Sequence, residues 1–443
     1  MKKYDYIIIG FGKAGKTLAS YLGSKNFNVA LIEKSKSMYG GTCINIGCIP
    51  TKILVEEANH STPYKEAIER KNNLISLLRD KNYEKLVSNK NVTLYNGIGS
   101  FISKNEIKIT SPSKEEIIFG DTIFINTGAE SVIPSIEGID KIKNIYTSAT
   151  LMEVNELPKS LAIIGGGYIG LEFASIYNTF GSKITILENG PDILLKEEPE
   201  IQLEIKTIFK NRDITILTDT TVVKLEQNGD SVKIYYRNKY NEVKILEVSA
   251  ILVATGRKAN IKDLNLEAAG INFTDRGIDV DKHLKTNIDN IFALGDVAGH
   301  LQFTYISLDD FRIVKNYLFG DKTKSQEERD IIPYSVFISP TLSRVGLSEK
   351  EAIKKGYNVK TNILKVNTIP RAKILKSETG IFKAVVDSDT NKILGCTLLG
   401  ELSSEIINIV TLAIKENKTF EYLQNFIFTH PSMSESLNDL FSF

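Results

Sequence analysis

The sequence predicts an α/β protein that contains two similar βαβ units and, after them, a smaller third domain. Each unit begins with a short apolar strand that runs through a glycine-rich turn into a helix, first in YDYIIIGFGKAGKTLASYL and again in SLAIIGGGYIGLEFASIYNTF. A second strand closes each unit, in NVALIE and in KITILE. Because 443 residues exceed what one hydrophobic core usually organises, we expect each unit to belong to its own domain.

Segments between and after the two units supply further elements. Residues 66–88 carry apolar positions at helical spacing among many charges, which is typical of an amphipathic surface helix, and residues 91–126 predict strands and turns. The segments ILVATG (251–256) and NIFALGD (290–296) are apolar strands that end in glycine-bearing turns. We expect these two strands to return to one shared sheet.

The character of the sequence changes near Ile332, where alternating strands replace the βαβ pattern. AVVDSDTNKILGC predicts a hairpin, and helices are expected near 402–417 and 419–426. No long Pro- or Gly-rich linker and no short-period repeat interrupts the chain. The sequence therefore predicts a third domain, of α+β type, packed against the other two.

Composition and charge argue against several classes of function. With 42% hydrophobic residues, 25% charged residues and a net charge of +1, nothing favours binding to nucleic acid or an anionic membrane. The apolar run from Tyr6 to Ile9 is far shorter than the roughly 20 residues that span a bilayer, and no signal-peptide core precedes it. Three cysteines suit a reducing compartment. We expect a cytoplasmic protein with small-molecule partners.

The first glycine-rich turn has the G-x-G-x-x-G spacing of a dinucleotide-binding motif. Gly10, Gly12 and Gly15 follow a strand and open a helix, so the backbone can approach a pyrophosphate at the helix N-terminus. Glu33 closes the next strand, where a carboxylate can accept a ribose hydroxyl. An ordinary tight βα turn is the structural alternative, because the glycine spacing alone is weak evidence.

The second unit repeats the whole arrangement, which chance rarely produces twice in one chain. Its motif residues are Gly165, Gly167, Gly170 and Glu188. A carboxylate at the end of the second strand, with no arginine directly after it, repels a 2′-phosphate and favours NADH over NADPH. Lys183 or Lys196 could still reach a phosphate, so NADPH stays open. Two bound dinucleotides are therefore predicted.

Two cysteines lie in YGGTCINIGCIPTK, just after the first acidic residue. Cys43 and Cys48 are close enough in sequence to close a small disulfide loop. A helix N-terminus or a cation lowers the pKa of a thiol, and Lys52 is the candidate cation. Half of a zinc site, or two inert buried thiols, are the alternatives, but Cys396 stands alone and no second cysteine pair exists. The pair predicts redox chemistry without a bound metal.

A dithiol that exchanges with a substrate requires a base, and His430 in FTHPSMSE is the candidate. Glu435 follows five residues later and is placed to orient the imidazole. This carboxylate and a Pro-containing turn distinguish His430 from the other three histidines. From spacing alone, an ordinary core or surface histidine is an equally good interpretation.

Five segments, in order, resemble the pyridine nucleotide-disulfide oxidoreductases of the glutathione reductase and lipoamide dehydrogenase type. They are GGTCINIGCIPTK, GGGYIGLEFA, ATGRKAN, ALGDVAG and HPSMSE, and the resemblance extends over essentially the whole chain. The fold that it implies has two Rossmann-like domains, for FAD and NAD, and a C-terminal α+β dimerisation domain. The implied boundaries are 1–145 for the first part of the FAD domain, 146–257 for the NAD(P) domain, 258–330 for the second FAD or central part, and 331–443 for the dimerisation domain.

The resemblance also implies roles for single residues. The cysteine that matches Cys48 lies against the flavin in a charge-transfer complex, and the one that matches Cys43 attacks the substrate. Lys52 pairs with Glu172 near the flavin N5. The further cofactor contacts that it implies are Asp296 at the ribityl chain, Tyr168 as a cover of the nicotinamide pocket, Thr42 and Gly256. The family's His and Glu match His430 and Glu435 and come from the partner subunit, so an obligate homodimer is implied.

Within the family, four segments most resemble the bacterial reactive-chlorine-resistance flavoproteins that act as hypothiocyanous acid reductases. They are GFGKAGKTLA, MYGGTCINIGCIPTK, LQFTYISLDD and HPSMSESLNDLF. The predicted electron path runs from NADH through FAD and the Cys43/Cys48 disulfide to an oxidised small acceptor, with Cys43 kept ionised for attack. Mercuric reductases and large thioredoxin reductases resemble the chain less, because their C-terminal cysteine pairs are missing here.

Other substrates are compatible with the same path through FAD and the Cys43/Cys48 pair. Dihydrolipoamide, glutathione disulfide and a metal ion such as Hg(II) or Cu(II) are the alternatives among enzymes. A redox-sensing flavoprotein without turnover is the alternative of another class.

Overall fold

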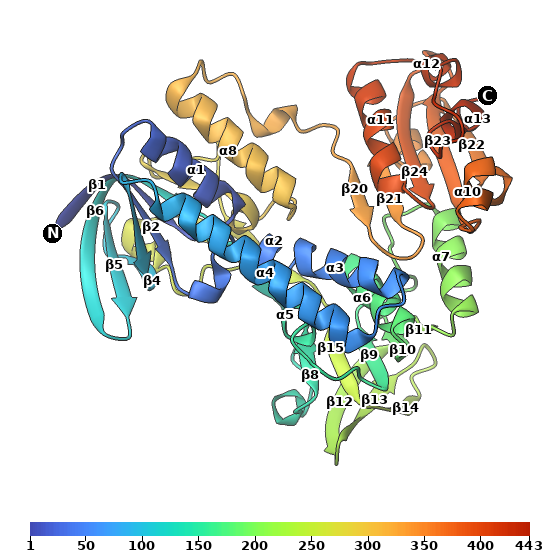
Figure 1. Cartoon of the computed structure of the whole chain (residues 1–443), viewed down its shortest axis with the longest axis horizontal. Helices are drawn as coiled ribbons and strands as arrows, with labels where there is room; N and C mark the ends of the chain where they lie inside the picture. The colour runs from blue at the N-terminus through green and yellow to red at the C-terminus, as the bar shows by residue number, and fades with distance from the viewer.

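The computed structural model describes residues 1–443 and shows three packed parts, each built on its own main sheet (Figure 1). The first sheet comprises β1 (Lys2–Ile9), β2 (Val29–Glu33), β3 (Val92–Asn96), β4 (Ile98–Phe101), β5 (Glu106–Ser111), β6 (Lys114–Ile125) and β19 (Ile291–Ala293). Strands β3, β2, β1, β6 and β19 run parallel, and β5 and β4 extend the sheet antiparallel to β6. Every residue of β2 is buried, as expected for a parallel strand covered on both faces.

The helices of the first part hold the turns that carry the motifs. They are α1 (Lys13–Ser24), α2 (Thr42–Asn45), α3 (Cys48–Asn59), α4 (Tyr64–Val87) and α8 (Thr304–Phe319). Helix α1 begins directly after the first glycine turn and packs against α8, although the two lie far apart in sequence. The long helix α4 confirms the amphipathic helix that the sequence predicts for 66–88.

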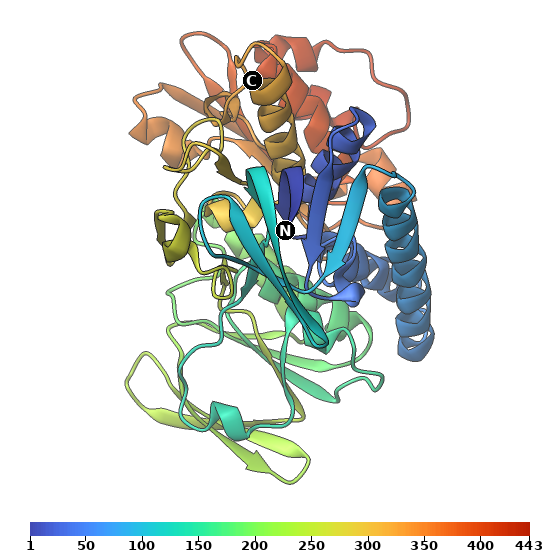
Figure 2. The same ribbon diagram turned by 90° about the vertical axis from the view of Figure 1, so that its left-hand side faces the viewer.

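The second sheet is entirely parallel, in the order β11-β10-β9-β15-β8. Its strands are β8 (Ile145–Thr147), β9 (Ser160–Ile164), β10 (Lys183–Leu187), β11 (Thr215–Leu217) and β15 (Ala250–Val253), with helices α5 (Ser148–Leu151), α6 (Tyr168–Thr179) and α7 (Pro199–Asn211). A separate antiparallel sheet of β12 (Thr221–Asn228), β13 (Ser231–Arg237) and β14 (Val243–Val248) lies at the bottom of Figure 2, away from the C-terminus. The predicted second βαβ unit, β9-α6-β10, is confirmed.

The third part is an antiparallel sheet in the order β20-β21-β24-β23-β22. Its elements are β20 (Tyr334–Val336), β21 (Leu342–Gly346), β22 (Val359–Lys365), β23 (Ile381–Asp387), β24 (Ile393–Leu399), α9 (Glu349–Lys354), α10 (Pro370–Ile374), α11 (Ser403–Lys415), α12 (Phe420–Gln424) and α13 (Ser436–Leu440). Strands β23 and β24 form the predicted hairpin, and α11 and α12 confirm the two predicted helices.

One prediction about the sheets is wrong. The strands expected to share a sheet separate, because β15 pairs with β8 and β9 in the second sheet whereas β19 pairs with β6 in the first. A short apolar strand has the same local pattern next to either neighbour, so its sequence does not select the sheet. The chain crosses between the two parts at β7 (Ala129–Ser131) and β16 (Arg257–Ala259), which pair antiparallel.

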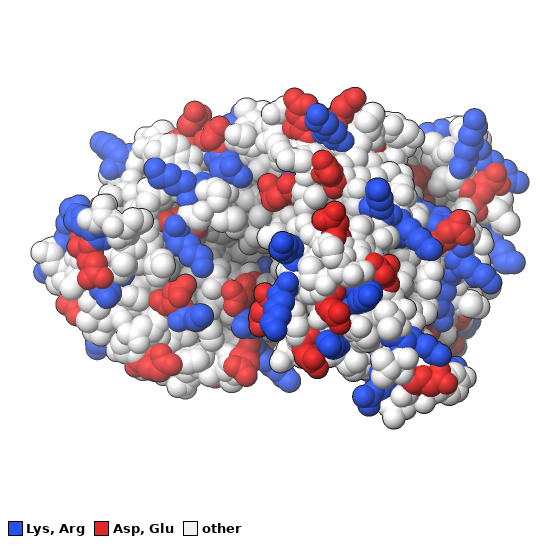
Figure 3. All heavy atoms as spheres, turned by 90° about the horizontal axis from the view of Figure 1, so that it is seen from below, with Lys and Arg blue, Asp and Glu red and all other residues white.

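The domain boundaries expected at 145, 257 and 330 stay predictions. None of the helices combines the length and apolarity needed to span a bilayer. On the face shown in Figure 3, acidic and basic side chains are interspersed, without a broad field of either sign.

Candidate active site

A cavity of about 1520 Å³ runs from the first glycine turn, past both cysteines, to the N-terminus of α6. This volume exceeds the roughly 300–1,000 Å³ of a usual small-molecule pocket, so an extended ligand such as a dinucleotide has room there. The predicted residues that line it are Gly10, Gly12, Glu33, Thr42, Cys43, Cys48, Lys52, Tyr168, Glu172 and Asp296. The tertiary fold thus brings residues from three segments to one cavity.

The first glycine turn is packed too closely for side chains. Gly10 has a φ of +108°, and a Cβ there would lie 2.3 Å from the carbonyl oxygen of Asn126. A Cβ on Gly12 would lie 2.4 Å from Asn126 Oδ1, and one on Gly15 would lie 2.6 Å from the carbonyl oxygen of Gly10. The glycines therefore let the turn lie flat against the end of β6, which leaves the side toward the cavity free for a pyrophosphate.

Asn126 is a residue that the sequence interpretation missed. Its Oδ1 accepts a hydrogen bond from the Gly15 amide at 2.9 Å, and its Nδ2 donates to the Leu294 carbonyl at 2.6 Å. It therefore ties the first glycine turn to the segment that leads to Asp296. The only signal in the sequence is a polar residue directly after an apolar strand, in TIFINTG.

Two backbone amides hold the carboxylate of each motif acid, Glu33 and Glu188. Glu33 accepts hydrogen bonds from the amides of Phe11 and Ser35, both at 3.0 Å, and burial raises its pKa against the effect of these bonds. Glu188 accepts from the amides of Gly166 and Gly190, both at 2.6 Å. Each carboxylate keeps unused acceptor capacity, so both fit the ribose of a dinucleotide.

The second glycine turn repeats the packing of the first. Gly165 has a φ of +110°, and a Cβ there would lie 2.5 Å from the Ala254 carbonyl oxygen, while a Cβ on Gly170 would lie 2.1 Å from the Gly165 carbonyl oxygen. Around Gly167 and Gly256 there is open space within 4 Å of a Cβ. These residues lie outside the cavity that holds the cysteines. The second turn therefore has the same close packing as the first, outside that cavity and next to Tyr168 at the start of α6.

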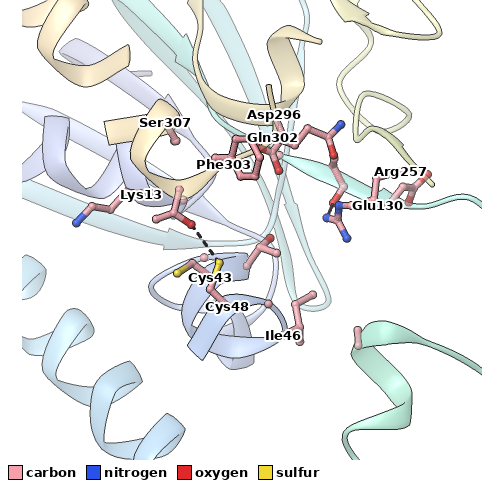
Figure 4. Close-up of a pocket in the computed structure, with 18 of the residues that line it drawn as sticks. Lys13, Cys43, Ile46, Cys48, Glu130, Arg257, Asp296, Gln302, Phe303 and Ser307 are labelled. Atoms are coloured by element: carbon pink, nitrogen blue, oxygen red, sulfur yellow. Dashed lines mark hydrogen bonds between the residues drawn. The ribbon is translucent and has the colours of Figure 1, made fainter. Parts of the chain in front are cut away.

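Both cysteines point into the cavity, Cys43 from α2 and Cys48 from the start of α3 (Figure 4). The thiols are free, and the Cys48 sulfur lies 3.5 Å from the hydroxyl of Thr304 at the start of α8. Cys48 is the first residue of α3, where the helix dipole favours a thiolate. Thr304 is a second residue that the motif reasoning missed, although it lies in LQFTYISLDD.

The reduced pair carries its negative charge on Cys48. A hydrogen bond from the Cys43 thiol, with smaller effects from Thr304 and Lys52, lowers the pKa of Cys48 to about 6. The same hydrogen bond and burial raise the pKa of Cys43 well above its usual value. The predicted ionisation of Cys43 therefore depends on a group that takes its proton. Cys43 needs a base before it can attack a substrate.

Lys52 and Glu172 form an ion pair that joins α3 to α6. The Lys52 ammonium lies 3.0 and 2.9 Å from the two carboxylate oxygens of Glu172. Glu172 also accepts from the Phe337 amide at 2.8 Å, and the Phe337 ring lies 4.5 Å from the Lys52 ammonium. A cation beside the cavity and near Cys48 suits an electron-rich flavin ring and a thiolate.

Asp296 lies on the opposite side of the cavity, near Gln302 and Phe303 (Figure 4). Burial raises its pKa, and the nearby Arg257 opposes that shift. The neighbouring Gly295 amide donates to buried Asp310 at 2.6 Å, which fixes the turn. A carboxylate at this place fits the hydroxyls of a ribityl chain.

The structure does not bring His430 to the cysteines of the same chain. Its Nδ1 lies 2.8 Å from Glu435 Oε2, as expected, but its side chain is 73% exposed. It lies between α12 and α13, which Figure 1 places at the far side of the third part from α2 and α3. The cavity lining contains no histidine. No histidine of the same chain is therefore placed to act as a base for Cys43.

Two family signatures match the chain. Pyridine nucleotide-disulphide oxidoreductase matches residues 4–310, and the pyridine nucleotide-disulphide oxidoreductase dimerisation domain matches residues 332–441.

Three relatives align with 98% or more of this chain. The probable pyridine nucleotide-disulfide oxidoreductase RclA of Escherichia coli (strain K12) is 46% identical and aligns with 100% of this chain and 99% of its own length. Mercuric reductase of Bacillus cereus is 32% identical over 98% of this chain and 70% of its own length. Dihydrolipoyl dehydrogenase of Chlamydia muridarum is 30% identical over 98% of this chain and 95% of its own length.

A solved structure agrees closely with this fold. The Cu(II) complex of the HOCl-induced flavoprotein disulfide reductase RclA from Escherichia coli superposes with a TM-score of 0.97 at 46% identity, and covers 100% of this chain and 99% of that one.

Proposed function

Because this chain belongs to the pyridine nucleotide-disulphide oxidoreductase family, we propose that it reduces hypothiocyanous acid with electrons from NADH. FAD and NAD(P)H are the cofactors of the family, and bound FAD supplies the relay between nicotinamide and disulfide. The observation that carries the proposal is that Cys43, Cys48 and the Lys52–Glu172 pair share one cavity with the first dinucleotide turn. The similarity to an HOCl-induced reductase supports a reactive chlorine-related oxidant as the acceptor.

The chemistry at sulfur has two displacement steps. The Cys43 thiolate attacks the sulfur of hypothiocyanous acid, a Cys43–thiocyanate S–S bond forms, the S–O bond breaks, and the oxygen leaves as water after it takes up a proton. The Cys48 thiolate then attacks Cys43 Sγ, which forms the Cys43–Cys48 disulfide and releases thiocyanate. Over the cycle, NADH and hypothiocyanous acid become NAD⁺, thiocyanate and water.

The partner subunit completes each site in this proposal. The dimerisation domain indicates a homodimer. The partner subunit's His430 takes the proton from Cys43 and returns it to the leaving oxygen, while the partner's Glu435 orients the imidazole. The exposed imidazole and the absence of histidine from the cavity support this arrangement. We place the protein in the cytoplasm, where NADH is available and its thiols stay reduced.

Glu188 supports NADH as the reductant. Its carboxylate is fixed at the end of the second βαβ unit by two backbone amides, where it can accept two ribose hydroxyls but repels a 2′-phosphate. NADPH is the alternative reductant, and the same assays compare both.

A screen of acceptors with the purified flavoprotein tests the choice of substrate. Hypothiocyanous acid is expected to sustain NADH oxidation at least about tenfold faster, as kcat/KM, than glutathione disulfide, Hg(II) or Cu(II). Dihydrolipoamide is assayed with NAD⁺ in the reverse direction. Strong turnover of dihydrolipoamide with none of hypothiocyanous acid contradicts the proposal. Oxidation that stops after one equivalent of NADH per subunit indicates a redox sensor instead.

The pH dependence of the reduced enzyme tests the assignment of the thiolate. A thiolate on Cys48 beside the flavin gives a long-wavelength absorption band, which is present above the pKa of Cys48 and lost as the pH falls through about 6. An ordinary thiol would lose the band near pH 8.5 instead. Spectra of the two-electron-reduced protein between pH 5 and about 9 measure the midpoint. Cys48→Ser removes the band at every pH, and a midpoint above about 8 would show that Cys43 does not stabilise the Cys48 thiolate.

A further inference from the structure

Tyr168, the expected cover of the nicotinamide pocket, is held by a buried carboxylate that no motif predicted. Tyr168 begins α6, and its hydroxyl donates to Glu197 Oε1 at 3.1 Å. Tyr334 on β20 donates to the same oxygen, and the two phenol rings lie 5.5 Å apart. Figure 1 shows that β20, from the third part, approaches α6, from the second. Two phenols from different parts of the fold therefore converge on one carboxylate oxygen.

The Glu197 carboxylate is buried and is held by few partners. The Glu197 side chain is completely buried, and its Oε2 has no hydrogen-bond partner. The only cation near that oxygen is Arg344 on β21, at 3.7 Å. Arg344 is itself buried, bonded to Glu351 and to the Lys196 carbonyl. A buried carboxylate requires such partners, and most of those that hold Glu197 come from the third part.

The three partners of Glu197 differ in how firmly the fold holds them beside its carboxylate. Arg344 and Tyr334 are tied to the third sheet, where the Tyr334 and Arg344 backbones pair in register. Tyr168 lies at the N-terminus of its helix and lines the cavity. Burial and the Glu197 charge raise the pKa of Tyr168 to about 12, so its phenol is a proton donor at neutral pH. Tyr168 can leave while Tyr334 and Arg344 still hold the carboxylate.

We propose that Glu197 is a positioning residue that sets the affinity of the site for NADH. Its hydrogen bond to the Tyr168 hydroxyl, here called the latch, holds Tyr168 in the closed position, where the phenol covers the nicotinamide pocket. The inference rests on the proposed function and on the role that the family resemblance implies for Tyr168, a cover that the nicotinamide must displace to reach the flavin. A ligand that binds only the open form loses apparent affinity in proportion to the fraction that is closed. The charge-assisted hydrogen bond from Tyr168 to Glu197 is made only in the closed form, so it keeps the closed fraction high.

The test measures flavin reduction by NADH in anaerobic rapid mixing, without any acceptor. Glu197→Gln keeps the size of the side chain but removes its charge, so the apparent Kd for NADH is expected to fall by about tenfold. The limiting rate of reduction at saturating NADH should stay within about twofold, because no group that touches the reacting atoms changes. This division between Kd and limiting rate would not result from a general loss of structure.

Four further variants make the test specific. Tyr168→Phe should lower the Kd similarly, and adding Glu197→Gln to it should have no further effect, because both changes remove one interaction. Tyr334→Phe should raise the Kd, because opening then leaves Glu197 with Arg344 alone. Glu351→Gln is the matched control, since Glu351 contacts Arg344 but neither tyrosine, and its Kd should equal that of the wild type.

Different results overturn different claims. An unchanged Kd in Glu197→Gln, with full flavin content and normal thermal stability, rules out the latch. The same is true if Glu197→Gln still lowers the Kd in the Tyr168→Phe background. If neither NADH nor NADPH reduces the flavin of the wild type, the proposed function itself fails, and the latch fails with it.

Discussion

Cys43→Ser is expected to lower acceptor turnover by about a thousandfold or more, while FAD binding and flavin reduction by NADH persist. The serine hydroxyl is not ionised near neutral pH and cannot form the S–S bond to thiocyanate, so the first displacement is lost. The flavin side of the site is unaffected, because Lys52, Glu172 and Asp296 keep their places. Steady-state assays with hypothiocyanous acid and rapid mixing with NADH measure the two halves separately.

Two other cysteine variants provide controls for this prediction. Cys396 is buried on β24 and does not line the cavity, so Cys396→Ala should retain full turnover. Cys48→Ser should allow one attack but no resolution, which leaves one thiocyanate equivalent bound to Cys43 and visible by mass spectrometry of the intact protein. Full acceptor turnover in Cys43→Ser would show that the roles of the two cysteines are assigned incorrectly.

His430→Ala is expected to slow the reaction of the dithiol with acceptor by about a hundredfold, with little change in flavin reduction by NADH. The cause is the raised pKa of Cys43, which leaves little thiolate for attack without a base. Glu435→Gln should have a smaller effect in the same direction, because the imidazole loses the partner at its Nδ1. Rapid mixing resolves the two half-reactions. His60→Ala changes an exposed histidine outside the cavity and serves as the control.

A heterodimer distinguishes a base from the partner subunit from one in the same chain. One chain carries Cys43→Ser and the other carries His430→Ala, each with a different affinity tag. If the base crosses the interface, one site contains both substitutions and the other contains neither, so the heterodimer has about half of the wild-type activity. If the base acts within its own chain, both sites are damaged and activity stays low. Equal slowing of both half-reactions in His430→Ala would also contradict its role as the base of the dithiol.

The sequence alone predicted the parts of the site that depend on local geometry. A strand, a glycine turn and a helix are encoded within about twenty consecutive residues, because hydrophobic periodicity and φ > 0 positions act locally. Both βαβ units, with Glu33 and Glu188 at their second strands, therefore follow from the sequence and are present in the structure. The Cys43/Cys48 spacing likewise predicted a redox pair, because cysteines this close in sequence can close a small disulfide loop.

Contacts between distant segments could be expected only from the family resemblance or not at all. Lys52 and Glu172 are 120 positions apart in the sequence, and Glu197 and Tyr334 are 137 positions apart. No local pattern encodes which strand neighbours β15 or β19, or that Asn126 supports the first glycine turn. Such pairings depend on how the sheets pack, which buries a carboxylate only where a partner from another segment is present.

The sequence by itself determined the two dinucleotide motifs, the redox pair and the α/β class, because each is set by residues that are neighbours along the chain. Only the tertiary structure decided which thiol of the reduced pair holds the charge, that Glu197 holds Tyr168, and that His430 lies away from the cysteines of its own chain. Electrostatic and hydrogen-bond energies depend on distances through space and on burial, and folding sets both.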